Sequence, residues 1–128
     1  MPYRVLIVES DECLRKSLLV SFARSGFDIA EAINYSQALY RVYESNIDLV
    51  VMESLMSDGN GFEVCHEFRN NFGIPVILLG QESGDQVWER VMTANADHYE
   101  IKPYKYVSLI ARAQAILRRY KPVAGDTN

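Results

Sequence analysis

Short apolar runs alternate along the chain with longer stretches in which apolar residues recur at helical spacing. The runs are rich in Val, Ile and Leu, as buried strands usually are. Strands are therefore expected over residues 5–8, 27–32, 49–52, 75–79 and 97–101. Because a helical stretch follows every run, the order predicts a parallel sheet with helices on both faces.

Polar residues and glycines indicate where the expected helices begin and end. Asp11 or Ser10 can cap the first helix, and Gly26 can end it. Asn34 or Ser36 can cap the second helix. A turn is expected over residues 57–61, and the later helices over residues 62–70, 84–94 and 106–120.

Length and charge narrow the class of protein. The 128 residues fit one domain over residues 1–120, followed by a linker or frayed tail over residues 121–128. A formal net charge of −4 argues against nucleic-acid binding by this domain itself. No apolar run is long enough to span a membrane, and the first residues lack an apolar signal core. A cytoplasmic location is therefore expected, with no membrane partner.

Residues that follow the strands are the candidates for chemistry, because ligands of such sheets bind beyond the carboxyl ends of the strands. These residues are Glu9, Ser10, Asp11, Glu53, Gly80 and Lys102. Several carboxylates beside one lysine suit a hard divalent cation and a phosphoryl group. The alternative is a solvated rim of charged loops, which is common at strand ends.

Six separated segments carry a resemblance to a known family. They cover residues 5–11, 48–53, 61–64, 74–79, 94–99 and 102–104. In this order and spacing they resemble the receiver domain of two-component response regulators, over about residues 3–120. The resemblance implies an α/β, flavodoxin-like, doubly wound sheet of five parallel strands in the order 2-1-3-4-5. Five helices would cover it, giving three layers.

The family's phosphorelay chemistry depends on a few positions. Two acidic residues after the first strand help to hold Mg²⁺, and an aspartate after the third strand takes the phosphoryl group. A Thr or Ser after the fourth strand and a lysine after the fifth contact that group, and a nearby aromatic residue changes rotamer in response. This chain matches the first acidic position with Glu9, the lysine with Lys102 and the switch aromatic with Tyr99.

Three central positions depart from the family pattern. Ser10 stands at the second acidic position, Glu53 replaces the phosphoryl-accepting aspartate, and Gly80 replaces the Thr or Ser. Mg²⁺ binding, for which Glu9 and Glu53 are the candidate ligands with partial help from Asp11, is therefore expected to be weak or absent. No other cofactor is expected.

Glu53 leaves three interpretations open. It can pair with Lys102 and partly imitate the phosphorylated form, it can mark a decayed site, or it can still accept a phosphoryl group slowly. In the first two interpretations the chain is an atypical receiver domain that acts through protein contacts. Because no cofactor or nucleophile motif occurs, it is not expected to be an enzyme.

Gly80 also removes bulk beside Tyr99, so the ring is expected to turn inward without a trigger. The alternative is a partly buried strand tyrosine with no switching role. The resemblance further implies a cis peptide bond between Lys102 and Pro103, because this bond is cis in the family.

The last helix resembles that of receiver domains joined to winged-helix DNA-binding domains. A homodimer is therefore expected through the fourth helix, fifth strand and fifth helix, with the candidate residues Trp88, Asp97, Arg112 and Arg119. For Trp88 the alternative is ordinary helix packing. The expected partner is a sensor histidine kinase or another signalling protein, and a further DNA-binding domain beyond this sequence is possible.

A flavodoxin-like cofactor-binding protein is the alternative from a different functional class. The acidic stretch at residues 9–12 would repel a cofactor phosphate, and no dinucleotide or P-loop glycine motif occurs. The sequence therefore favours the signalling domain.

Overall fold

The fold is a five-stranded parallel sheet, seen in a computed structural model that describes residues 2–120. The strands are β1 (Arg4–Val8), β2 (Asp28–Ala32), β3 (Leu49–Glu53), β6 (Val76–Gly80) and β7 (His98–Ile101). Their order across the sheet is β2-β1-β3-β6-β7. This confirms the strand order expected from the sequence, and each strand begins and ends within one residue of its predicted bounds, because a continuous apolar run marks most of them.

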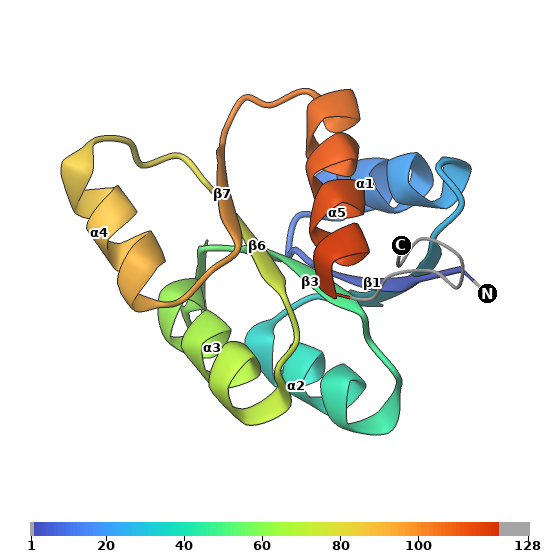
Figure 1. The fold of residues 1–128 in the computed structure, drawn as a ribbon, viewed down its shortest axis with the longest axis horizontal. Coiled ribbons are helices and arrows are strands. Elements are labelled where there is room, and N and C mark those ends of the chain that lie inside the picture. The colour runs from blue at the N-terminus through green and yellow to red at the C-terminus, as the bar shows by residue number, and fades with distance from the viewer. Residues whose placement is uncertain (1, 121–128) are drawn as a thin grey trace.

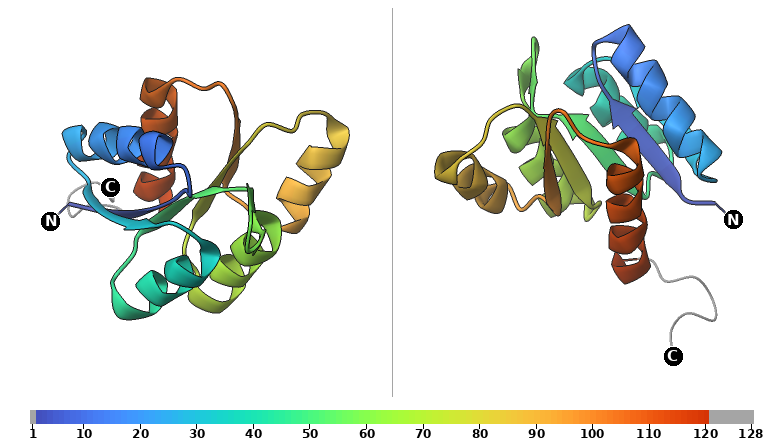
Figure 2. Two further views of the ribbon diagram at one scale, coloured as in Figure 1. Left: turned by 180° about the vertical axis from the view of Figure 1, so that it is seen from behind. Right: turned by 90° about the horizontal axis from the view of Figure 1, so that it is seen from above.

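Helices cover both faces of the sheet and make three layers (Figures 1 and 2). One face carries α1 (Glu12–Arg24) and α5 (Tyr106–Tyr120), and the other carries α2 (Tyr35–Glu44), α3 (Gly61–Glu67) and α4 (Asp85–Thr93). No helix of the described part of the chain is long and apolar enough to cross a membrane.

Each face has its own apolar core, since alternate residues of a strand point to opposite sides. On β1, Val5 and Ile7 pack with α1 and α5, whereas Leu6 and Val8 pack with α2, α3 and α4. The central strands β1, β3 and β6 are almost wholly buried, but the edge strand β2 is mostly exposed. The strand ends thus extend from the most deeply buried part of the molecule.

Helix caps agree with the sequence at two positions. The Asp11 carboxylate accepts a hydrogen bond from the Leu14 N–H, so Asp11, and not Ser10, caps α1. The Asn34 side chain accepts one from the Gln37 N–H and caps α2.

Two local features differ from the sequence prediction. A turn was expected over residues 57–61, and residues 57–58 form one, but it joins β4 (Leu55–Met56) and β5 (Gly59–Asn60), which pair as a short antiparallel hairpin that was not expected. A single helix was expected over residues 62–70, but α3 passes into a π-helical segment, η1 (Phe68–Phe72). The tail expected over residues 121–128 lies outside the described residues.

Candidate functional site

The carboxyl ends of β1, β3 and β7 bring three charged side chains together, as the sequence predicted. Lys102 follows β7, and its Nζ lies 2.7 Å from Oε2 of Glu53 and 3.9 Å from Oε1 of Glu9. All three side chains are mostly buried, with 19%, 13% and 5% of their area exposed. The Lys102–Glu53 contact is a close ion pair.

Backbone contacts fix the position of Glu9. Its Oε2 accepts a hydrogen bond from the Asp11 N–H at 3.0 Å, while its Oε1 has no hydrogen-bond partner among the described residues. Ser10 and Asp11 are exposed, and the Asp11 carboxylate is already used as the cap of α1. The structure therefore brings Glu9, Glu53 and Lys102 together but leaves Asp11 outside the cluster.

The donors at this site fit Mg²⁺ poorly. Mg²⁺ needs several oxygen ligands in octahedral geometry, but Glu9 and Glu53 already share one ammonium group. Nowhere in residues 2–120 do three or more His, Cys, Asp or Glu side chains converge as a metal ion would require. Asp11 was expected to compensate in part, but one of its carboxylate oxygens accepts the capping hydrogen bond from the Leu14 N–H.

Burial dominates the electrostatics of Glu53. Removal of the carboxylate from water raises the pKa of Glu53 to about 7, the contact with Lys102 acts against this shift, and the neighbouring Glu9 adds to it. Two carboxylates that face one ammonium leave one negative charge in excess, so a bound proton is favoured there. The charge of Glu53 is therefore sensitive to pH near neutrality.

Tyr99 turns inward, as Gly80 led us to expect. The residue is 2% exposed, and its hydroxyl donates a hydrogen bond to the Glu82 carbonyl at 2.9 Å. The Tyr99 ring packs edge-on against Trp88, with ring centroids 5.5 Å apart, and also lies near Phe62. The expected cis bond between Lys102 and Pro103 is also present.

Arg15 is a site residue that sequence reasoning missed. Its buried guanidinium donates to the Glu9 carbonyl at 2.9 Å and pairs with Glu31 at 2.9 Å. It thereby holds the turn that carries Glu9 and Ser10. An arginine three residues before Leu18 on an apolar helical stripe was the signal that could have found it.

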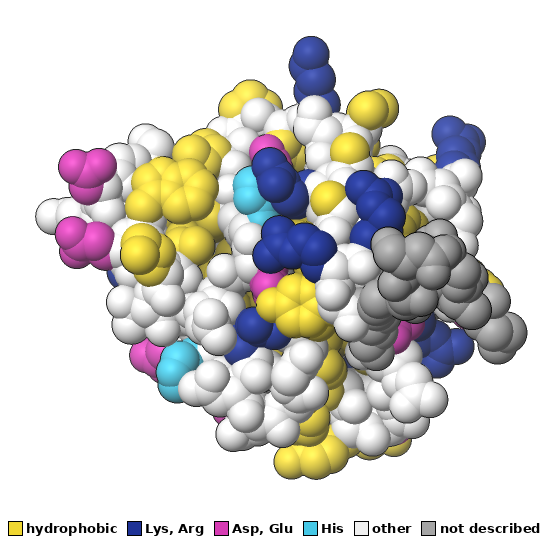
Figure 3. Space-filling view, viewed as in Figure 1, with side chains coloured by type: hydrophobic (Ala, Val, Ile, Leu, Met, Phe, Trp, Pro, Cys, Tyr) yellow, Lys and Arg dark blue, Asp and Glu magenta, His cyan; other side chains and the backbone are white. Residues whose placement is uncertain are grey.

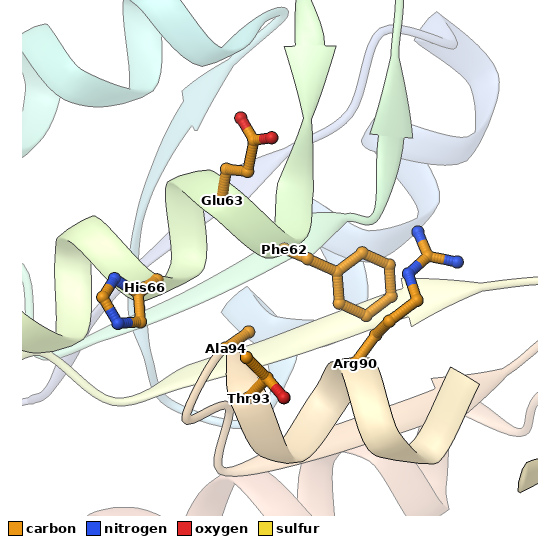
Figure 4. Close-up of a pocket in the computed structure, with 6 residues that line it drawn as sticks. All are labelled: Phe62, Glu63, His66, Arg90, Thr93 and Ala94. Carbon is orange, nitrogen blue, oxygen red and sulfur yellow. The ribbon is translucent and has the colours of Figure 1, made fainter. Parts of the chain in front are cut away.

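A pocket of about 290 Å³ lies between α3 and α4 and contains none of the strand-end residues. Figure 4 shows its lining, which is Phe62, Glu63, His66, Arg90, Thr93 and Ala94. The Arg90 guanidinium lies over the Phe62 ring at 4.3 Å and pairs with Glu82 at 2.8 Å. Arg90, which lines the pocket, therefore also contacts Glu82, whose carbonyl accepts the hydrogen bond of the Tyr99 hydroxyl.

The face made by α4, β7 and α5 shows an apolar patch over α4 and a group of Lys and Arg side chains nearer α5 (Figure 3). Trp88 is 41% exposed, and Arg112 and Arg119 are exposed on α5. Asp97 differs from the others, since its carboxylate accepts from the Val76 N–H. The same carboxylate also contacts Arg69 and the Tyr120 hydroxyl. Asp97 is thus engaged within the chain, and little of it remains for a partner subunit.

The geometry of the strand ends agrees with a comparison against known families. The model of the response regulator receiver domain matches residues 5–114. The chain belongs to this family.

Two relatives extend the comparison of this receiver domain. It is 34% identical over 119 residues to the DNA-binding response regulator MtrA of Mycolicibacterium smegmatis, covering 93% of this chain and 52% of that protein. It is 35% identical over 128 residues to the response regulator MprA of a Mycobacterium species, covering 98% of this chain and 55% of that protein. The receiver domain thus spans about half the length of these relatives.

A solved structure has the same fold as the receiver domain. It is a two-component response regulator from Clostridium difficile, with a TM-score of 0.87 and 28% identity. The match covers 93% of this chain and 98% of that one. The flavodoxin-like fold expected from the sequence is confirmed.

Proposed function

We propose that this receiver domain signals through protein contacts and that Glu53 and Lys102 hold it in one state without phosphoryl transfer. The observation that carries the proposal is the 2.7 Å contact between the two side chains at the end of β3. The carboxylate of Glu53 has two oxygens and one charge, whereas a phosphoryl group has three oxygens and nearly two charges. Glu53 therefore imitates a phosphorylated site in part.

Three features argue against efficient phosphoryl transfer. Catalysis of this reaction depends mainly on positioning, and Glu53 carries one methylene more than aspartate. Gly80 offers no hydroxyl to the transferred group. The Lys102 ammonium lies against the two carboxylates that would bind a divalent cation. We therefore expect weak or absent Mg²⁺ binding and no enzymatic activity.

The proposed output surface is the face of α4, β7 and α5. Trp88 and Met92 expose apolar area on α4, and Arg112 and Arg119 add positive charge on α5 (Figure 3). An exposed tryptophan is the kind of residue that anchors an interface. We infer a homodimer through this face, with Trp88 at its centre and the arginines at its rim.

The longer relatives suggest the context of the domain. MtrA is named a DNA-binding response regulator, and this chain corresponds to about half of it. We propose that the domain belongs to a cytoplasmic regulator that contains a DNA-binding part and that receives input from a sensor histidine kinase or another signalling protein. The acidic receiver domain itself is not expected to bind nucleic acid.

Incubation with Mg²⁺ and a small phosphoryl donor, followed by intact mass measurement, tests the proposal. We expect no stable added phosphoryl group on the native domain. The variant that combines Glu53→Asp with Gly80→Thr should gain some labelling, because it restores the shorter nucleophile and the hydroxyl together.

Glu53→Ala combined with Gly80→Thr is the matched control, since it has the hydroxyl but no carboxylate at the end of β3. It should stay unlabelled. Stable labelling of the native domain, lost in Glu53→Ala, would overturn the proposal and identify a slow phosphoacceptor.

A further inference from the structure

The space next to Gly80 is already filled. A methyl group added at this position would overlap the Tyr99 hydroxyl and would lie 2.6 Å from the Ser54 Oγ and 2.9 Å from the Tyr99 Cε1. Real side-chain carbons essentially never approach other atoms this closely. Two hydroxyl groups from different strands therefore occupy the volume that a side chain at position 80 would need.

Ser54 can move very little. It is 5% exposed and directly follows Glu53 at the end of β3. Its N–H donates to the Leu79 carbonyl at 2.8 Å, and its carbonyl accepts from the Gly61 N–H at 2.8 Å. Because the backbone is held on both sides, the Ser54 hydroxyl stays next to Gly80.

Tyr99 reaches the same space from β7. Its backbone pairs with Leu78 in β6, and its hydroxyl donates to the Glu82 carbonyl. The ring is rigid, so it cannot make room at Gly80 except by leaving its inward position.

We propose that Ser54 is a positioning residue for Tyr99. Position 80 has lost its side chain, the Ser54 hydroxyl lies where that side chain would be, and the two residues together form a close-fitting seat for the end of the Tyr99 ring. This seat holds Tyr99 inward independently of the ion pair between Glu53 and Lys102. It does not depend on whether Glu53 accepts a phosphoryl group.

Trp88 provides a direct reporter of the Tyr99 position. It is the single tryptophan of the chain, and its ring packs edge-on against Tyr99. Outward movement of Tyr99 would remove that packing and expose more of Trp88 to water. The expected signature is a red shift of Trp88 emission and stronger quenching by acrylamide, measured without any phosphoryl donor.

Gly80→Ala is the first variant, and it should give this signature together with a lower urea midpoint. The same substitution should lower the midpoint less in a Tyr99→Phe background and in a Ser54→Ala background, because each removes an atom that the new methyl group would meet. Such non-additivity is the mark of residues in contact. Equal losses in all three backgrounds would contradict the proposal.

Ser54→Ala alone is a milder variant that keeps the test valid if Gly80→Ala does not fold. It should raise acrylamide quenching of Trp88, since the seat becomes looser. Glu53→Gln should leave Trp88 emission unchanged. Native-like quenching in Ser54→Ala, or a red shift in Glu53→Gln equal to that of Gly80→Ala, would overturn the inference. A phosphorylated native domain would instead contradict only the proposed function.

Discussion

Tyr35 and Tyr104 both place a phenol near the strand-end carboxylates, but their hydroxyls have different surroundings. The Tyr35 hydroxyl donates to the Glu53 carbonyl at 2.7 Å. The Tyr104 hydroxyl is buried and has no hydrogen-bond partner among the described residues. Burial raises the pKa of both groups, so both stay neutral.

This pair predicts opposite effects on stability. Tyr35→Phe should lower the free energy of unfolding by about 1 kcal/mol, because it removes a formed hydrogen bond. Tyr104→Phe should leave it unchanged or raise it by up to about 1 kcal/mol, because a buried unpaired hydroxyl is itself unfavourable. Urea unfolding measures both. An equal loss in the two variants would show that the Tyr104 hydroxyl has a partner after all.

The raised pKa of Glu53 predicts how stability depends on pH. An unfolded glutamate loses its proton near its ordinary value of 4.5, whereas folded Glu53 keeps it up to about 7. Between these values the folded state binds more protons, so stability falls as the pH rises. Glu53→Gln should flatten that slope in urea unfolding between about pH 5 and pH 8.

Glu67→Gln is the control for this titration, since Glu67 is exposed on α3. It should keep the slope of the native domain. If Glu53→Gln keeps the native slope as well, burial does not raise the pKa of Glu53.

At the scale of elements, the caps give the clearest prediction. Asp11→Ala and Asn34→Ala should each lower the free energy of unfolding by about 1 kcal/mol, because each leaves a helix N–H without its acceptor. Ser10→Ala should change it by less than about 0.5 kcal/mol. If Ser10→Ala lowered the free energy of unfolding as much as Asp11→Ala, the assignment of Asp11 as the cap of α1 would be wrong.

Sequence patterns predicted the strands and helices well because burial imposes a period on each of them. The hairpin of β4 and β5 was not predicted, because each strand has only two residues and such a short strand shows no periodic pattern. The π-helical segment after α3 was not predicted, because the spacing of its apolar residues is close to that of an ordinary helix. Glu9, Glu53 and Lys102 could be predicted to meet, since parallel strands end at one edge.

Contacts that depend on tertiary packing could not be predicted in the same way. Ser54 is one polar residue after a strand, and nothing local indicates that its hydroxyl would lie beside Gly80. Asp11 had two possible uses, as cap or as cation ligand, and only the geometry of the turn shows that it caps α1.

For the whole molecule, the exposed face of α4, β7 and α5 predicts self-association. Trp88→Ala should weaken the dimer by more than about tenfold, the effect of losing an aromatic anchor worth about 2 kcal/mol. Arg112→Glu should weaken it less and in a salt-dependent manner, as rim charges do. Sedimentation equilibrium measures both.

Tyr40→Ala is the control for that experiment, because Tyr40 is exposed on α2, which packs on β2 and β1 at the opposite edge of the sheet from β7. It should not alter association. A native domain that stays monomeric at high concentration, or a loss of association in Tyr40→Ala alone, would place the interface elsewhere or remove it.

The contact between Gly80 and the end of Tyr99 also restricts the order in which an aspartate at position 53 and a threonine at position 80 could be acquired. Gly80→Thr as a first step would meet the Tyr99 ring, and Glu53→Asp as a first step would shorten the arm that now reaches Lys102. Either order passes through an intermediate that has lost a contact before it has gained any chemistry. Such epistasis disfavours acquiring the two substitutions one mutation at a time.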